Sequence, residues 1–169
     1  MATDLPDIPT VGDEHAMLTS FLDYFRAVFA RKVEDLDDAQ ALVQVPPSPL
    51  DLLGMTRHLA DVERWWFRAV FTAEVDTGIY DSDDDPDLDW HHTSSDTLAE
   101  ALGHWRAEVG RSQEITATTP NLATIGQMVT ERRGEVSLRW IMIHMIEEYA
   151  RHGGHADYLR EAIDGSTGD

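Results

Sequence analysis

The stretch HMIEEYARHGGHAD, residues 144–157, carries three histidines and two adjacent glutamates in a segment whose apolar residues otherwise repeat at the spacing of a buried helix. At about 100° per residue, His144, Glu148, His152 and His155 fall within about 80° of one another on such a helix. Apolar residues of the same segment share this sector, so Glu148 and His152 are expected to point into the core. An unpaired carboxylate there would be costly, and a divalent cation would compensate it.

Two of these residues have the spacing of metal ligands. Glu148 and His152 lie four positions apart, so their side chains meet on one helix face, as two ligands of one ion require. A third ligand must come from another helix, and His58 lies on the apolar stripe of the segment that follows Pro49. The set His58, Glu148 and His152 has the composition of hydrolytic zinc and non-haem iron centres. Taken singly, each histidine is better explained as a hydrogen-bonded core or surface residue, and only the combination favours a metal.

The other two histidines of the segment have open roles. His144 and His155 would either support the ligands through hydrogen bonds or replace one of them. A two-metal carboxylate bundle is disfavoured, because its repeated Glu-x-x-His pattern is absent: Arg151 stands three residues after Glu148.

The apolar spacing along the chain predicts an all-α fold of four amphipathic helices. They are expected at residues 13–36, 49–73, 95–116 and 138–163. Four helices of this length match a four-helix bundle, whose usual cofactor sites lie between facing helices. One domain is expected over residues 1–169, with an irregular N-terminus at 1–12, long loops between helices two and three and between helices three and four, and a short tail at 165–169. The tryptophans at helical spacing are expected in the core rather than in a ligand cage: Trp65, Trp66, Trp105 and Trp140.

Capping residues mark the expected helix ends. Ser48 is the predicted N-cap of the second helix, and Ser94 or Ser95 opens the third. Ser137 caps the fourth helix, which is expected to end at Gly165.

The two long loops show no helical period. The first holds six aspartates between Asp81 and Asp89, which indicates a solvated loop. Alternate aspartates from Asp81 to Asp85 begin like a calcium-binding loop, but Pro86 stands where that loop needs glycine, so calcium is not expected. Residues 118–136 are expected to form a long irregular connection. It has room for a short strand pair, but the sequence does not indicate which residues would form it.

Charge and amino-acid content argue against several classes of partner. The chain has 32 acidic and 13 basic residues, and its formal charge of -19 repels the phosphates of nucleic acids and anionic membranes. It has no cysteine, so a metal must be held by His, Asp, Glu or water. No secretory leader and no apolar run of membrane-spanning length is present, and the cytoplasm is the expected location.

Three strings resemble the DinB-like superfamily: LLGMTRHLADVERWWFRAVF (52–71), DPDLDW (85–90) and VSLRWIMIHMIEEYARHGGHADYLREAIDG (136–165). They look like the branch of the mycothiol-dependent maleylpyruvate isomerase, in its N-terminal metal-binding domain. The resemblance implies a four-helix bundle with a divalent metal, zinc first and nickel second. Matched by position, the ligands are His58, Glu148 and His152, with glutamate where many relatives have a third histidine. Relatives often dimerise, so a homodimer is expected.

The function implied by this resemblance is thiol-dependent transfer or isomerisation. Mycothiol or a similar low-molecular-weight thiol would be the cosubstrate and a small electrophile the substrate, and because the chain has no cysteine the sulfur must arrive with the thiol. His155 or His144 would act as general base or orient a ligand. Two alternatives stay open: a hydrolase whose metal activates water, and a non-catalytic stress protein that binds a metal or small ligand. Turnover without thiol favours the first, and metal binding without turnover favours the second.

Overall fold

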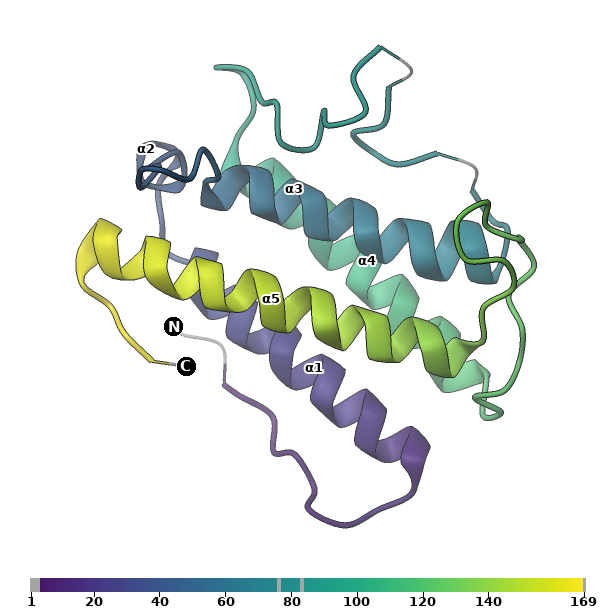
Figure 1. The fold of residues 1–169 in the computed structure, drawn as a ribbon. Helices are drawn as coiled ribbons and strands as arrows, with labels where there is room; N and C mark the ends of the chain where they lie inside the picture. The colour runs from purple at the N-terminus through teal and green to yellow at the C-terminus, as the bar shows by residue number, and fades with distance from the viewer. Residues whose placement is uncertain (1–3, 76, 83, 169) are drawn as a thin grey trace.

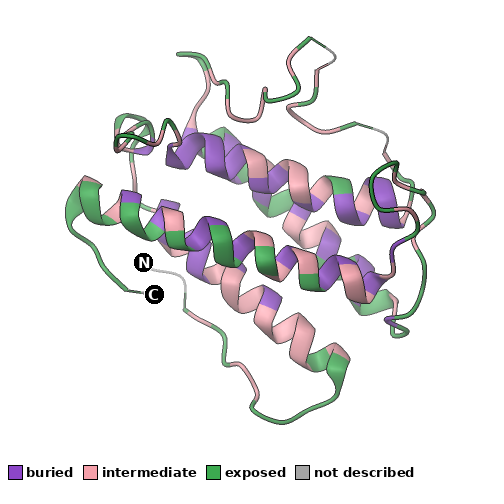
Figure 2. Ribbon diagram, in the orientation of Figure 1, coloured by how far each residue is buried: buried purple, intermediate pink, exposed green. Residues whose placement is uncertain are grey.

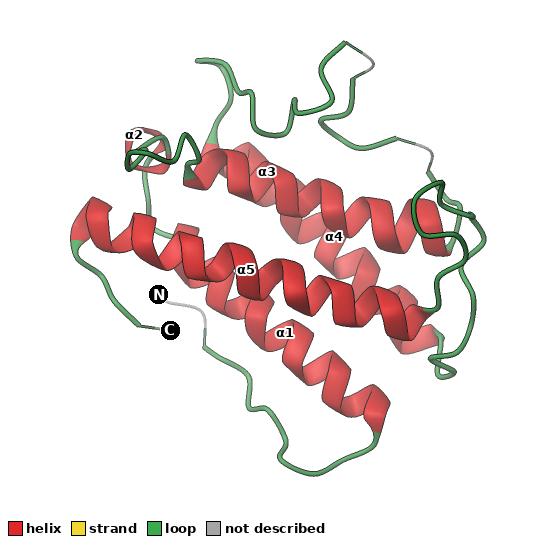
Figure 3. Ribbon diagram, viewed as in Figure 1, coloured by secondary structure: helices red, strands yellow, loops and turns green. Residues whose placement is uncertain are grey.

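The computed structural model describes residues 4–75, 77–82 and 84–168 (Figure 1). Within these ranges the chain consists of helices and loops, without a strand (Figure 3). The helices are α1 (Glu14–Val33), α2 (Asp38–Ala41), α3 (Leu52–Glu63), the π-helical η1 (Arg64–Phe71), α4 (Leu98–Thr118) and α5 (Leu138–Asp164). Because η1 continues α3 without a break, the long helices form the predicted four-helix bundle.

The long helices pack as two close pairs. α1 lies along α5 and α3 lies along α4, and these two pairs have the most extensive contacts. α3 and α5 touch each other over a smaller area, and we call the line between them the α3/α5 seam. Buried residues follow the helix faces that look toward one another, and α3 is buried along most of its length (Figure 2). Within the described residues, no helix is both long enough and apolar enough to cross a membrane.

The ends of α5 are where the sequence predicts them. The Oγ of Ser137 accepts a hydrogen bond from the backbone N–H of Trp140 at 3.3 Å, which satisfies one of the free donors of the first turn. Gly165 adopts a φ of 77°, a left-handed conformation that costs glycine little, and its N–H donates to the carbonyl of Glu161. The helix that carries the histidines is therefore capped at both ends.

Two predicted N-caps are wrong. α3 is capped by Asp51, whose Oδ1 accepts from Gly54 N at 2.9 Å, whereas the Oγ of Ser48 accepts from Leu50 N in the preceding turn. α4 is capped by Thr97 and not by a serine at 94 or 95. Ser48 thus accepts a backbone donor of its own turn, which competes with capping, and the Ser95 hydroxyl lies 2.8 Å from that of Thr93.

The chain between α1 and α3 also differs from the prediction. α1 ends at Val33 and not at residue 36, because Asp35 turns the chain with a left-handed φ of 66°. The short helix α2 follows, which the apolar spacing does not predict. Its cap is a reciprocal pair in which Asp37 Oδ1 accepts from Gln40 N and Gln40 Oε1 accepts from Asp37 N.

The second loop docks on the end of η1. Gln127 N donates to the carbonyl of Phe71 at 3.1 Å and Met128 N donates to that of Val70 at 3.0 Å. Gly126 permits this approach, since a Cβ there would lie 2.8 Å from the carbonyl oxygen of Val70. In this loop the described residues form isolated bridges rather than a strand pair, and one of the bridges joins Thr130 and Gly134.

The prediction that all four tryptophans lie in the core is wrong at one position. Trp66 and Trp105 are buried and Trp140 is partly buried, but Trp65 is 37% exposed. Neighbouring residues on a helix point about 100° apart, so Trp65 and Trp66 do not both face the core. Asp83, the middle residue of the calcium-like spacing, lies outside the described residues, as do residues 1–3 and 169 at the ends.

Candidate metal centre

The α3/α5 seam brings together the three residues predicted as ligands. His58 comes from α3, and Glu148 and His152 come from successive turns of α5. One candidate ligand atom from each residue lies within 4.8 Å of the other two. His152 is buried, and the side chains of His58 and Glu148 are 22% and 14% exposed. The three groups therefore converge on one point that is mostly shielded from water.

The residues present fit a divalent cation. Among the described residues, no hydrogen-bond partner faces Nε2 of His152, although this atom is buried and lies 3.3 Å from Glu148 Oε2. Two ligand atoms about 2.1 Å from a tetrahedral zinc ion are themselves about 3.4 Å apart. The pair thus has the separation of two ligands and lacks the alignment of a hydrogen bond. A cation would use the imidazole lone pair that is otherwise buried without compensation.

Asp89 orients the third residue. Its Oδ2 lies 2.6 Å from Nδ1 of His58, and because a carboxylate only accepts, Nδ1 carries the proton. The lone pair of His58 is then on Nε2, as a metal-binding imidazole needs. Trp90 packs its ring 4.7 Å from the His58 ring and limits rotation. The expectation that Asp89 lies in a solvated loop is wrong, since its side chain is only 15% exposed.

His144 lies on the other side of Glu148. Its Nε2 is 3.4 Å from Glu148 Oε1 and its Nδ1 is 3.2 Å from Glu147 Oε2. The imidazole stacks on Trp140, with the ring centres 4.9 Å apart, and Trp66 meets it edge-on at 5.0 Å. His144 is therefore held beside the candidate ligands and within reach of a molecule bound there.

His155 is placed differently. Its Nε2 lies 3.4 Å from the Oγ of Ser48, in the turn before α3. His155 belongs to neither group of described residues whose side chains converge closely enough for a metal. These groups are His58, Glu148 and His152, and His144, Glu147 and Glu148. One turn of α5 thus separates His155 from the seam at which His152 converges with His58.

The electrostatics of the site keep Glu148 anionic. Its contact with the side chain of His152 lowers its pKa below the ordinary value, and the nearby imidazoles of His144 and His58 act in the same direction. Burial acts in the opposite direction but is the smaller effect. A carboxylate binds a divalent ion in its ionised form, so Glu148 is in the protonation state that a metal ligand needs.

Two hollows flank the site, and Trp65 and Trp66 line both. The first, which we call the arginine hollow, has a volume of about 560 Å³ and is lined by Met128–Arg133 together with His144 and Glu148. The second, which we call the aspartate hollow, has a volume of about 370 Å³, and its lining includes His58, Asp61, Val62, Gly78, Tyr80, Asp81, Pro86 and Asp89. The centre can therefore be approached from two sides, one lined by three aspartates and the other by two arginines and two glutamates.

A buried polar network fixes the helices around the centre. Arg26 of α1 donates from Nε and Nη2 to the two oxygens of Glu63 in α3, at 2.7 and 2.8 Å. Tyr149 of α5 donates its hydroxyl to Glu63 Oε1 at 2.8 Å, and Trp105 Nε1 of α4 donates to the Tyr149 oxygen at 2.7 Å. Because Tyr149 follows Glu148 directly, the network holds the turn of α5 that carries this carboxylate.

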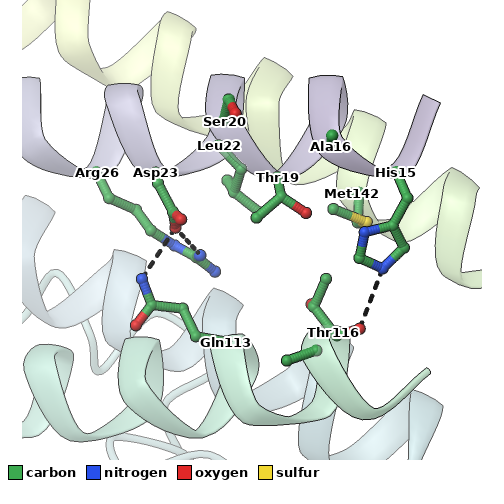
Figure 4. Close-up of a pocket in the computed structure, with 11 residues that line it drawn as sticks. His15, Ala16, Thr19, Ser20, Leu22, Asp23, Arg26, Gln113, Thr116 and Met142 are labelled. Atoms are coloured by element: carbon green, nitrogen blue, oxygen red, sulfur yellow. Dashed lines mark hydrogen bonds and ion pairs between the residues drawn. The ribbon is translucent and has the colours of Figure 1, made fainter. Parts of the chain in front are cut away.

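A third hollow, of about 400 Å³, lies between α1 and α4 (Figure 4). His15 closes one end by its 3.2 Å contact with the carbonyl of Thr116, and Asp23 accepts from Gln113 and Arg26 at the other. Its lining includes none of the three candidate ligands. The candidate metal centre therefore lies at the α3/α5 seam and not in this third hollow.

A helical bundle with a histidine, a glutamate and a second histidine gathered across two of its long helices belongs to the DinB-like class. The sequence model of the mycothiol-S-transferase family matches residues 17–165, and the chain belongs to this family. The match confirms the DinB-like resemblance and supports transfer to or from the sulfur of mycothiol. No curated protein matches the chain.

Proposed function

We propose that the protein is a divalent-metal-dependent S-transferase that joins the sulfur of mycothiol, or of a similar small thiol, to a small electrophile. The observation that carries the proposal is the convergence of His58, Glu148 and His152, with the buried Nε2 of His152 facing no hydrogen-bond partner among the described residues. Membership of the mycothiol-S-transferase family supports the thiol part of the proposal. Zinc is the proposed metal, with nickel second.

The chemistry that the metal supplies when bound is a lowered pKa for a thiol, which becomes a nucleophilic thiolate at neutral pH. The thiol must come from the cosubstrate, because the chain has no cysteine. His58, Glu148 and His152 would hold the ion, and Asp89 would keep His58 in the tautomer that binds it.

Between the two histidines left without a ligand role, the geometry favours His144 as the proton acceptor. It lines the arginine hollow beside Glu148, whereas His155 contacts Ser48. His144 would take the thiol proton as the thiolate forms. The thiolate sulfur would then bond to carbon, and the leaving group would depart with the electron pair of its bond to carbon. His144 also stacks on Trp140, which keeps the imidazole oriented toward the hollow.

The proposal is tested by incubating zinc-loaded protein with mycothiol and 1-chloro-2,4-dinitrobenzene and measuring the thioether that forms. The thiol sulfur forms a bond to the ring carbon, chloride leaves, and the proton passes to the base and then to buffer. We expect catalysed thioether formation above the spontaneous rate, its loss after chelation, and its return on adding zinc. His152→Ala should abolish it, while the matched control His15→Ala, a histidine of the α1/α4 hollow, should keep it.

Two results would overturn the proposal. Metal-dependent cleavage of an ester without any thiol, with no thioether formed, would make the protein a hydrolase. Stoichiometric metal binding without turnover of thiols and electrophiles would make it a binding protein.

A further inference from the structure

We propose that Arg132 and Arg133 form a carboxylate-binding subsite beside the metal centre, so that the electrophile is a small carboxylic acid with an apolar body. This inference rests on the proposed function, because it names the substrate class of the same site. It stands on the two neighbouring arginines without an ion pair, on the turn that holds them, and on the difference in charge between the two hollows: three aspartates line one, and two arginines balance two glutamates in the other.

Arg132 and Arg133 form no ion pair with a carboxylate among the residues that the structure describes. The chain has 32 acidic residues for 13 basic ones, and most of its basic side chains form ion pairs with carboxylates. In the part of the chain that the structure describes, the exceptions are Arg31, Arg132, Arg133 and Arg151. Two of these four are neighbours, and both line the arginine hollow. Unpaired cations in so acidic a protein leave binding capacity for an anion from outside.

A tight turn holds both arginines at the hollow. Thr130 N donates to the carbonyl of Gly134 at 3.0 Å, and Gly134 N donates back to the carbonyl of Thr130 at 2.9 Å. The hydroxyl of Thr130 also accepts from Arg133 N at 3.2 Å, and Gly134 has a left-handed φ of 70°. The backbone of residues 131–133 is thus fixed, which lowers the entropy cost of binding a ligand there.

Arg133 is arranged to bind a planar anion. Its guanidinium carbon lies 4.9 Å from the centre of the Trp140 ring, and Trp140 in turn stacks on His144. A guanidinium that lies over an aromatic face keeps the N–H groups at its edge free to donate. Those edges match the two oxygens of a carboxylate, and Arg132 supplies a second cation to the same hollow. The anion would therefore lie close to the proposed proton acceptor.

The two hollows discriminate between charges. Asp61, Asp81 and Asp89 line the aspartate hollow, which repels a carboxylate, so the anion is directed to the arginine hollow. The walls there include the apolar side chains of Trp65, Trp66, Met128 and Val129. The two acids of the arginine hollow are Glu148, a proposed metal ligand, and Glu131, which forms no ion pair with the arginines within the described residues. An apolar body with one carboxylate is the complement of this lining.

Binding of an unreactive probe tests the subsite without any turnover. Zinc-loaded protein is titrated by calorimetry with 4-methylbenzoate and with 4-methylbenzamide, which share one apolar body and differ in charge. We expect the benzoate to bind more tightly, and the double variant R132Q/R133Q to lose about tenfold in affinity for it, with the amide unchanged. The control R151Q removes another exposed, unpaired arginine, on α5, and should change neither affinity.

Turnover supplies the second arm. With mycothiol and 4-(chloromethyl)benzoate, the sulfur bonds to the benzylic carbon, chloride leaves and the thiol proton passes to His144 and then to buffer. R132Q/R133Q should raise KM for this acid about tenfold and leave KM for 4-(chloromethyl)benzamide unchanged.

A benzoate affinity that survives in R132Q/R133Q would mean that the carboxylate binds the metal alone, and would overturn the subsite. Catalysed transfer to the amide with no preference for the acid would overturn the substrate class and leave the proposed transferase standing. Arginine-dependent benzoate binding without thioether formation would keep the subsite and refute the transferase.

Discussion

Glu63→Gln is expected to lower the free energy of unfolding by about 3 kcal/mol, because it leaves the buried guanidinium of Arg26 without its main counter-charge. Glu63 is fully buried and accepts three hydrogen bonds, two from Arg26 and one from the hydroxyl of Tyr149. Breaking a buried pair from one side costs about 3–5 kcal/mol. Asp23, 3.0 Å from Arg26 and partly exposed, keeps some compensation, so the lower end applies.

Urea unfolding followed by tryptophan fluorescence measures the effect. The matched control is Glu114→Gln, the same chemical change in an exposed ion pair with Arg111, and it should cost no more than about 0.5 kcal/mol. Replacing both partners, as R26M/E63L, should recover part of the loss, because no buried charge is then left unpaired. The remaining cost arises from the Tyr149 hydroxyl, which has lost its acceptor. A cost below about 1 kcal/mol for Glu63→Gln at unchanged denaturant slope, or a double variant less stable than the single one, would refute the reasoning.

Four further substitutions probe the site and its frame. Asp89→Ala should weaken zinc binding about 10- to 100-fold, seen in competition with a chelator of known affinity, and unchanged affinity would show that the aspartate does not support the centre. His144→Gln should lower the transfer rate at least about 100-fold with metal content unchanged, while His155→Gln should not; the reverse order would assign the base to His155. Gly126→Ala should cost about 1–3 kcal/mol in urea unfolding, since its Cβ would lie 2.8 Å from the carbonyl oxygen of Val70, and a neutral effect would show that the docked loop can shift.

The parts of the fold that sequence predicts are the local ones. The ends of α5 follow from Ser137 and Gly165, whose effects reach only one turn. The convergence of Glu148 and His152 follows from their spacing of four, and His58 follows from its place on an apolar stripe. Helix periodicity is sufficient for the inferences on the three candidate ligands, and capping residues are sufficient for the helix ends.

The supports of the site depend on tertiary contacts and were missed. In the sequence, Asp89 is one of several acids in a loop and nothing distinguishes it from the others. Its contact with His58 exists only because the loop folds back onto α3. The proposed role of Arg132 and Arg133 depends on where their turn docks, which no pattern in the sequence predicts. One signal was available: Glu63 follows Leu59 by four positions on the apolar face of α3, and a carboxylate at such a position indicates a buried partner.

Metal content is the most direct test of the central claim. Untagged protein is stripped with a chelator, reloaded with zinc, dialysed and assayed by elemental analysis, beside His58→Ala, Glu148→Ala and His152→Ala and the control His15→Ala. We predict about one zinc per chain in the wild type and the control, and loss of bound zinc in the three variants. One zinc per chain retained by Glu148→Ala and His152→Ala, or no zinc in the reloaded wild type, would contradict the metal centre.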